Sequence, residues 1–111
     1  MDIGQIEKAA NRLRSRTFAT PLISSKILNK LAGRRIMLKP ECLQHTGSFK
    51  YRGAFNAISN LSKKDLANGV SAYSSGNHAQ GIALAARQHQ CASVIVMPED
   101  APQLKINNTR R

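Results

Sequence analysis

The chain has 111 residues, 41% of them hydrophobic and 21% charged, which is typical of a single globular domain. No apolar run approaches the roughly 20 residues that span a bilayer, and the polar start does not resemble a signal peptide. We therefore expect a cytoplasmic protein with no membrane partner. The net charge of +11 favours nucleic acid as a partner, but the cations are scattered and aromatic residues make up only 5%, so we expect no nucleic-acid partner.

The first forty residues are predicted to form two short helices and one strand. Apolar residues at helical spacing follow Asp2, a suitable N-cap, and extend to Leu13. A second helical patch, "SSKILNKLAG", should end at Gly33. The apolar residues 36–38 of "RRIMLKPE" suit a short buried strand that Pro40 ends.

Helices and strands alternate along the rest of the chain. A helix with an apolar face over residues 54–61 precedes a polar link, "SKKDLANG", and a strand, "GVSAYSS". An alanine-rich, largely buried helix is predicted from Asn77 to about His89, then a buried strand, "ASVIVMP", and another helix after Pro102. With the strand at 36–38 the order is βαβαβ, which predicts an α/β fold with a three-stranded parallel sheet.

In open parallel sheets, ligands bind beyond the carboxyl ends of the strands, and two loops there carry suitable residues. The first, "PECLQHTGSFK", ends in Lys50. Lys50 could be a solvated lysine in the first turn of a helix, the common fate of a lysine. It could also be a partly desolvated amine with a pKa below its usual value of about 10.4, able to form a Schiff base. Local sequence chemistry alone does not choose between these alternatives.

The second loop, "SSGNH", leads into the alanine-rich helix. Gly76 allows close approach of the backbone, and the free amides of a helix start favour a carboxylate or a phosphate. Ser74, Ser75 and Asn77 add side-chain donors. The simpler alternative is that Ser75 or Asn77 is only the N-cap of the helix.

A metal site is a further possibility, because Cys42 and His45 are three residues apart and His89 and Cys91 could complete a set of four ligands. The His-x-Cys spacing is unusual for structural zinc, so we expect no metal. Two cysteines are also too few for a disulfide framework. We therefore expect ordinary reduced thiols.

Four sequence blocks carry a resemblance to a known family. They are "TPL" at 20–22, "LKPECLQHTGSFKYRGAFNAI" at 38–58, "SSGNHAQGIALAA" at 74–86 and "VIVMPEDAP" at 94–102. In this order they resemble the serine/threonine dehydratase and serine racemase family, which uses pyridoxal 5'-phosphate. The resemblance implies a parallel sheet of the tryptophan synthase β-like class (fold type II), truncated here. It also implies an amino-terminal part of the cofactor-lysine domain at residues 1–64 and the start of a small βαβ domain at 65–111.

The resemblance also implies a role for each site residue. Lys50 would be the Schiff-base lysine and the general base, with Phe49 beside the cofactor ring. Asn77 would bind the cofactor's 3-hydroxyl as well as substrate. Ser75, Gly76 and His78 would hold the substrate carboxylate, and Ser75 would also exchange a proton on the face opposite the lysine in a racemase.

The function implied is a threonine or serine ammonia-lyase, which eliminates the hydroxyl of L-threonine or L-serine to give a 2-oxo acid and ammonia. A serine racemase-type activity and a non-catalytic remnant are the alternatives. The glycine-rich loop that binds the cofactor phosphate in this family has no match in the sequence, so we expect an inactive fragment. Full-length relatives are expected to be homo-oligomers.

Overall fold

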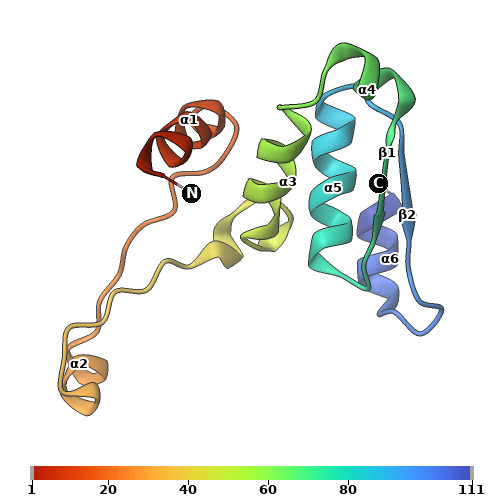
Figure 1. Ribbon diagram of the computed structural model, residues 1–111. Helices are drawn as coiled ribbons and strands as arrows, with labels where there is room; N and C mark the ends of the chain where they lie inside the picture. The colour runs from red at the N-terminus through yellow and green to blue at the C-terminus, as the bar shows by residue number, and fades with distance from the viewer. Residues whose placement is uncertain (1, 111) are drawn as a thin grey trace.

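The computed structural model describes residues 2–110 and has an α/β fold with a parallel sheet (Figure 1). Its elements follow in the order α1 (Ile3–Leu13), α2 (Lys26–Ala32), the 3-10 turns η1 (Glu41–Leu43) and η2 (His45–Gly47), α3 (Lys50–Ile58), α4 (Lys63–Asn68), β1 (Val70–Tyr73), α5 (Asn77–Gln88), β2 (Ser93–Val96) and α6 (Gln103–Arg110).

The first two helices begin and end where the sequence predicts. The Asp2 side chain accepts a hydrogen bond from the Gln5 amide at the start of α1. In the same way, Ser25 caps α2 through the Leu28 amide. Gly33 ends α2 with φ +63°, a left-handed conformation that glycine adopts without steric cost.

The core lies between α3 and α5, which pack side by side (Figure 1). Tyr51 is fully buried, and Phe55 and Ile58 extend the same face of α3. From α5, small alanines meet this face and allow the two helices to come close. Sequence periodicity therefore predicted both helices. Of the face predicted over residues 54–61, Ala54, Phe55 and Ile58 are buried, but Leu61 lies beyond the end of α3, and the buried Tyr51 was not predicted.

The sheet has two parallel strands in the part of the chain described, with Val70 opposite Ser93 and Tyr73 opposite Val96. The strand predicted at 36–38 is wrong. Leu38 instead forms an isolated antiparallel bridge with Ile23, and Met37 and Leu38 are both more than 40% exposed. An extended apolar segment becomes a strand only where another backbone pairs with it. Here the extended segment that follows α2 lies away from β1 and β2 (Figure 1).

Two further expectations were wrong about local burial and structure. The strand β2 is not buried on both faces, because Val94 and Val96 are 66% and 57% exposed. Tyr73 shares that face through the strand register, and no helix of the described chain covers it. The polar link also contains α4, which Ser62 caps through the Asp65 amide.

The predicted boundary between residues 64 and 65 falls within α4, and the division into two domains stays a prediction. Within residues 2–110, none of the helices has the length and apolar character needed to cross a membrane.

Candidate functional site

Two turns meet at one end of the α3–α5 pair. Both helices begin at that end, as Figure 1 shows. Gly81, in the second turn of α5, lies against Lys50 at the start of α3, since a Cβ added to Gly81 would be 3.2 Å from the Lys50 carbonyl carbon. The tertiary structure thus brings the Lys50 turn close to the start of α5, which the "SSGNH" turn precedes, although only the "SSGNH" turn follows a strand of the sheet.

Lys50 is the first residue of α3 and its side chain is exposed. Its Nζ lies 5.2 Å from the centroid of the neighbouring Phe49 ring, which is itself 62% exposed, within the range of a cation–π contact. The Lys50 side chain is therefore open to solvent, and its role as the Schiff-base lysine stays a prediction. An exposed amine can still react with an aldehyde that reaches it.

A bidentate ion pair holds the first turn of α3, two residues beyond Lys50, and was not among the predicted site residues. Arg52 donates from Nε to Glu41 Oε2 at 2.7 Å and from a terminal nitrogen to Oε1 at 2.9 Å. Thr20 donates to the same Oε1 at 2.5 Å. The hydrogen bond from Arg52 lowers the pKa of Glu41 from 4.5 to about 2, and the carboxylate in turn raises the pKa of Arg52. Opposite charges eleven residues apart form no recognisable motif, so only the folded chain reveals this pair.

The "SSGNH" turn is held by its own first residue, because Ser74 Oγ accepts the Gly76 amide at 3.2 Å. Gly76 is the N-cap residue of α5 and Asn77 is its first helical residue, with no side-chain cap. The alternative that Ser75 or Asn77 merely caps the helix is therefore wrong. Ser75 and Asn77 are exposed, and His78 is half-buried, so side chains of this turn remain open to a ligand.

Lys105 of α6 lies directly over this turn. A Cβ built on Gly76 would be 2.8 Å from Lys105 Nζ and 2.9 Å from its Cδ. The resemblance gave a role to Gly76 but none to Lys105. A helix that follows β2 reaches this turn only through the tertiary fold, which the local sequence does not show.

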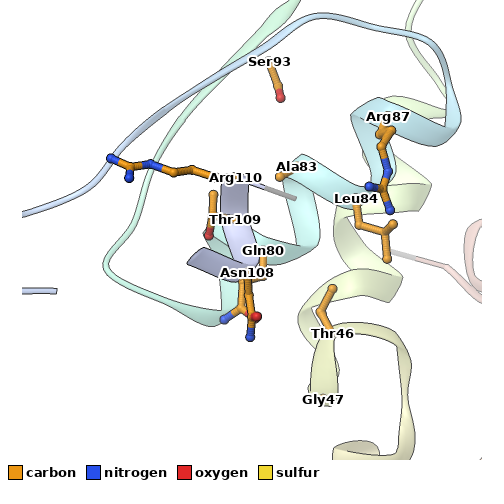
Figure 2. Close-up of a pocket in the computed structure, with 10 residues that line it drawn as sticks. All are labelled: Thr46, Gly47, Gln80, Ala83, Leu84, Arg87, Ser93, Asn108, Thr109 and Arg110. Carbon is orange, nitrogen blue, oxygen red and sulfur yellow. The ribbon is translucent and has the colours of Figure 1, made fainter. Parts of the chain in front are cut away.

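A groove of about 560 Å³ lies between η2, α5, α6 and the start of β2 (Figure 2). None of the predicted site residues lines it. Its lining residues are Thr46, Gly47, Gln80, Ala83, Leu84, Arg87, Ser93, Asn108, Thr109 and Arg110. The candidate site is therefore the open surface at the helix starts and not this groove.

The four residues considered for zinc do not come together as a metal site. His45 stacks on Phe18 with ring centroids 4.2 Å apart. His89 packs on Phe55 and lies 3.1 Å from Ser59 Oγ. Among residues 2–110 no group of three or more His, Cys, Asp or Glu side chains could hold a metal ion.

The donor set around Lys50 fits pyridoxal phosphate. Lys50 offers an exposed amine and Phe49 an exposed flat ring. The start of α5 offers the exposed Asn77 amide together with backbone amides that have no partner inside the helix. Ser48, next to Phe49, has a buried hydroxyl with no partner among the described residues. These groups would contact the ring and the aldehyde of the cofactor.

The fold and the "SSGNH" turn after β1 define a class, the open α/β proteins that bind a ligand beyond the carboxyl ends of parallel strands. The family follows from residues 13–111, which match the model of the pyridoxal-phosphate dependent enzymes. The chain belongs to that family, and its cofactor is therefore pyridoxal phosphate, as the sequence resemblance implied.

Its relatives include both ammonia-lyases and racemases. The chain is 52% identical over 103 residues to L-threo-3-hydroxyaspartate ammonia-lyase of Pseudomonas sp, covering 93% of the chain and 32% of the relative. It is 48% identical over 105 residues to L-threonine ammonia-lyase of Thermotoga maritima, covering 95% of the chain and 26% of the relative. The crystal structure of serine racemase from Dictyostelium discoideum superposes with a TM-score of 0.93 at 39% identity, over 99% of the chain and 36% of that structure.

The chain thus spans about a third of the length of the curated relatives it matches, or less. The fold type II assignment is confirmed by the solved structures of the family. The roles of Phe49, Lys50, Ser75, Gly76, Asn77 and His78 stay predictions.

Proposed function

We propose that this chain supplies the lysine and the substrate-binding turn of a pyridoxal-phosphate-dependent ammonia-lyase that acts on L-threonine or L-serine. The observation that supports it best is the contact between Gly81 and the Lys50 backbone, which brings the amine and the "SSGNH" turn to the same end of two packed helices. The relatives include an L-threonine ammonia-lyase, in agreement with this proposal.

Each residue has a distinct part in the proposal. When bound, the cofactor acts as an electron sink that favours loss of the α-proton from an amino acid. Lys50 would hold the cofactor through Nζ and then take that proton as the general base. The amides at the start of α5, with Ser75 and Asn77, would bind the substrate carboxylate.

The first test is attachment of the cofactor. The chain is incubated with pyridoxal phosphate, treated with borohydride and digested, and the modified lysine is identified by mass spectrometry. We expect Lys50 to be labelled much faster than other lysines, and Lys50→Ala to lose that fast phase. Lys63→Ala is the matched control, because Lys63 is also the exposed first residue of a helix. Equal labelling of Lys50 and Lys63 would contradict the proposal.

A racemase is the second candidate, because Ser75 is exposed in the turn that would face the substrate and the serine racemase structure superposes closely. In that reaction Ser75 would return a proton to the α-carbon from the side opposite Lys50. Substrate assays on a protein containing this chain would compare 2-oxo acid release with D-serine formation. Loss of D-serine alone in Ser75→Ala supports a racemase. No D-serine formation by the wild type would contradict a racemase, and release of the 2-oxo acid would support the lyase.

A further inference from the structure

We propose that the Glu41–Arg52 ion pair positions Lys50 for the cofactor, with Arg52 as the positioning residue. This inference rests on the proposed function of Lys50. It concerns residues that do not touch the reacting atoms, and it assigns a role to the bidentate ion pair at the start of α3.

The pair holds together three segments that are distant in the sequence. Arg52 reaches Glu41 through two hydrogen bonds, and it also donates to the Thr17 hydroxyl at 3.2 Å and to the Phe18 carbonyl at 3.0 Å. The Thr20 hydroxyl donates to Glu41. These contacts occupy most of the donors of one guanidinium. A planar guanidinium matches the geometry of a carboxylate better than the ammonium group of a lysine does. The first turn of α3 is therefore attached to residues 17–20 and to η1.

This attachment sets the rotation of α3 about its own axis. Lys50 and Arg52 are two residues apart and thus separated by about 200° around the helix, so Arg52 is anchored on roughly the opposite side from Lys50. Tyr51, between them, is fully buried against α5. With Tyr51 and Arg52 both held, the direction in which Lys50 leaves the helix is determined.

The Glu41 side chain is 13% exposed and that of Arg52 is 27% exposed, so water competes only weakly for this pair. Lys39 completes the arrangement by donating to the Thr20 carbonyl at 2.8 Å. The pair is therefore better suited to fixing a geometry than an exposed surface ion pair, which contributes little.

The experiment compares Glu41→Gln and Arg52→Lys with Arg12→Gln in the full chain. Arg12 is the matched control, because its Nε donates to Asn56 Oδ1 at 2.8 Å and so also ties a distant arginine to α3, but far from Lys50. Two reagents react with Lys50: pyridoxal phosphate followed by borohydride, and acetic anhydride. The first depends on orientation and the second only on an accessible amine.

We expect Glu41→Gln and Arg52→Lys to slow labelling of Lys50 by pyridoxal phosphate about tenfold or more, since a misplacement of about 1 Å can cost about 100-fold. Acetylation of Lys50 should be unchanged in both. Arg12→Gln should change neither rate more than about twofold. Wild-type labelling rates in Glu41→Gln, an equal loss in Arg12→Gln, or a parallel loss of acetylation would overturn the proposal.

A second readout separates this inference from the proposed function. Lysines are reductively methylated with ¹³C-formaldehyde and sodium cyanoborohydride, and the Lys50 methyl resonance is assigned with Lys50→Arg. We expect that resonance to move in Glu41→Gln and Arg52→Lys but not in Arg12→Gln. If pyridoxal phosphate fails to label even the wild type, the proposed function is contradicted, and an unmoved resonance in Glu41→Gln would overturn the positioning role as well.

Discussion

Gly81 of α5 lies so close to the backbone of Lys50 that a Cβ there would be 3.2 Å from the Lys50 carbonyl carbon and 3.3 Å from its oxygen. The neighbour is the backbone of a packed helix, which cannot move aside as a flexible side chain can. The closeness of α3 and α5 at the candidate site therefore depends on a residue without a side chain.

We expect Gly81→Ala to push the two helices apart and to lower the free energy of unfolding by about 1–3 kcal/mol, the usual cost of overpacking. Urea denaturation of the chain measures this. Gly53→Ala is the control, because Gly53 is an exposed position inside α3 where an added Cβ would have nothing within 4 Å. Since alanine favours a helix over glycine, Gly53→Ala should raise stability by up to about 1 kcal/mol. Loss of stability in both variants would contradict the packing explanation.

The ion pair at Glu41 predicts a dependence of stability on pH. The pKa of Glu41 is lowered from 4.5 to about 2 in the folded chain by its hydrogen bond with Arg52. A carboxyl with a lowered folded pKa stabilises the fold above its unfolded pKa, and that stabilisation is lost as the pH falls. The contribution should thus be complete above about pH 5 and disappear between about pH 4.5 and 2.

Unfolding free energies at several pH values, compared between wild type and Glu41→Gln, measure this contribution. We expect the difference between the two proteins to be about 1–3 kcal/mol near neutral pH, as for a buried charged hydrogen bond that loses its partner, and to shrink as the pH falls towards the folded pKa of Glu41. A difference that stays constant across this range would show that the Glu41 charge is not responsible.

Tyr51 is the largest fully buried side chain in the described chain, and its hydroxyl donates to Gln88 Oε1. Truncation by Tyr51→Ala should lower the free energy of unfolding by about 3–5 kcal/mol because it leaves a cavity between α3 and α5. Tyr51→Phe keeps the ring and should cost only about 1 kcal/mol for the lost hydrogen bond. Thermal unfolding followed by circular dichroism distinguishes these outcomes, and equal losses would show that the hydroxyl, not the ring, dominates.

Thr46 has φ +60°, a conformation that β-branched residues rarely adopt, and its buried hydroxyl has no partner among the described residues. We expect Thr46→Gly to raise the free energy of unfolding by about 1 kcal/mol by relieving this strain. Gly47 also has a positive φ, of +67°, so Gly47→Ala should lower stability instead. Chemical denaturation of Thr46→Gly and Gly47→Ala measures both changes in the free energy of unfolding. Destabilisation by Thr46→Gly would mean that the threonine makes a contact worth more than its strain.

Local sequence chemistry predicted the helices of this chain well. The cap at Asp2 and the stop at Gly33 act within a few residues. The helix that Ser62 caps was not predicted, because its polar residues resemble a link. The strands were harder, because pairing partners and covering layers are distant in sequence. Residues 36–38 have the composition of a strand, but the pairing there is a single bridge between Leu38 and Ile23.

The sequence by itself determined the family, because the Lys50 and "SSGNH" blocks have a specific order and composition, and it therefore determined the cofactor. Only the tertiary structure decided that Gly76 and not Ser75 or Asn77 is the N-cap residue of α5, that Gly81 meets Lys50, and that Arg52 is bound to Glu41. The physical reason is the separation along the chain over which each interaction acts. Caps and periodicity act over one or two helical turns, whereas the direction of Lys50 depends on contacts with segments that only folding brings together.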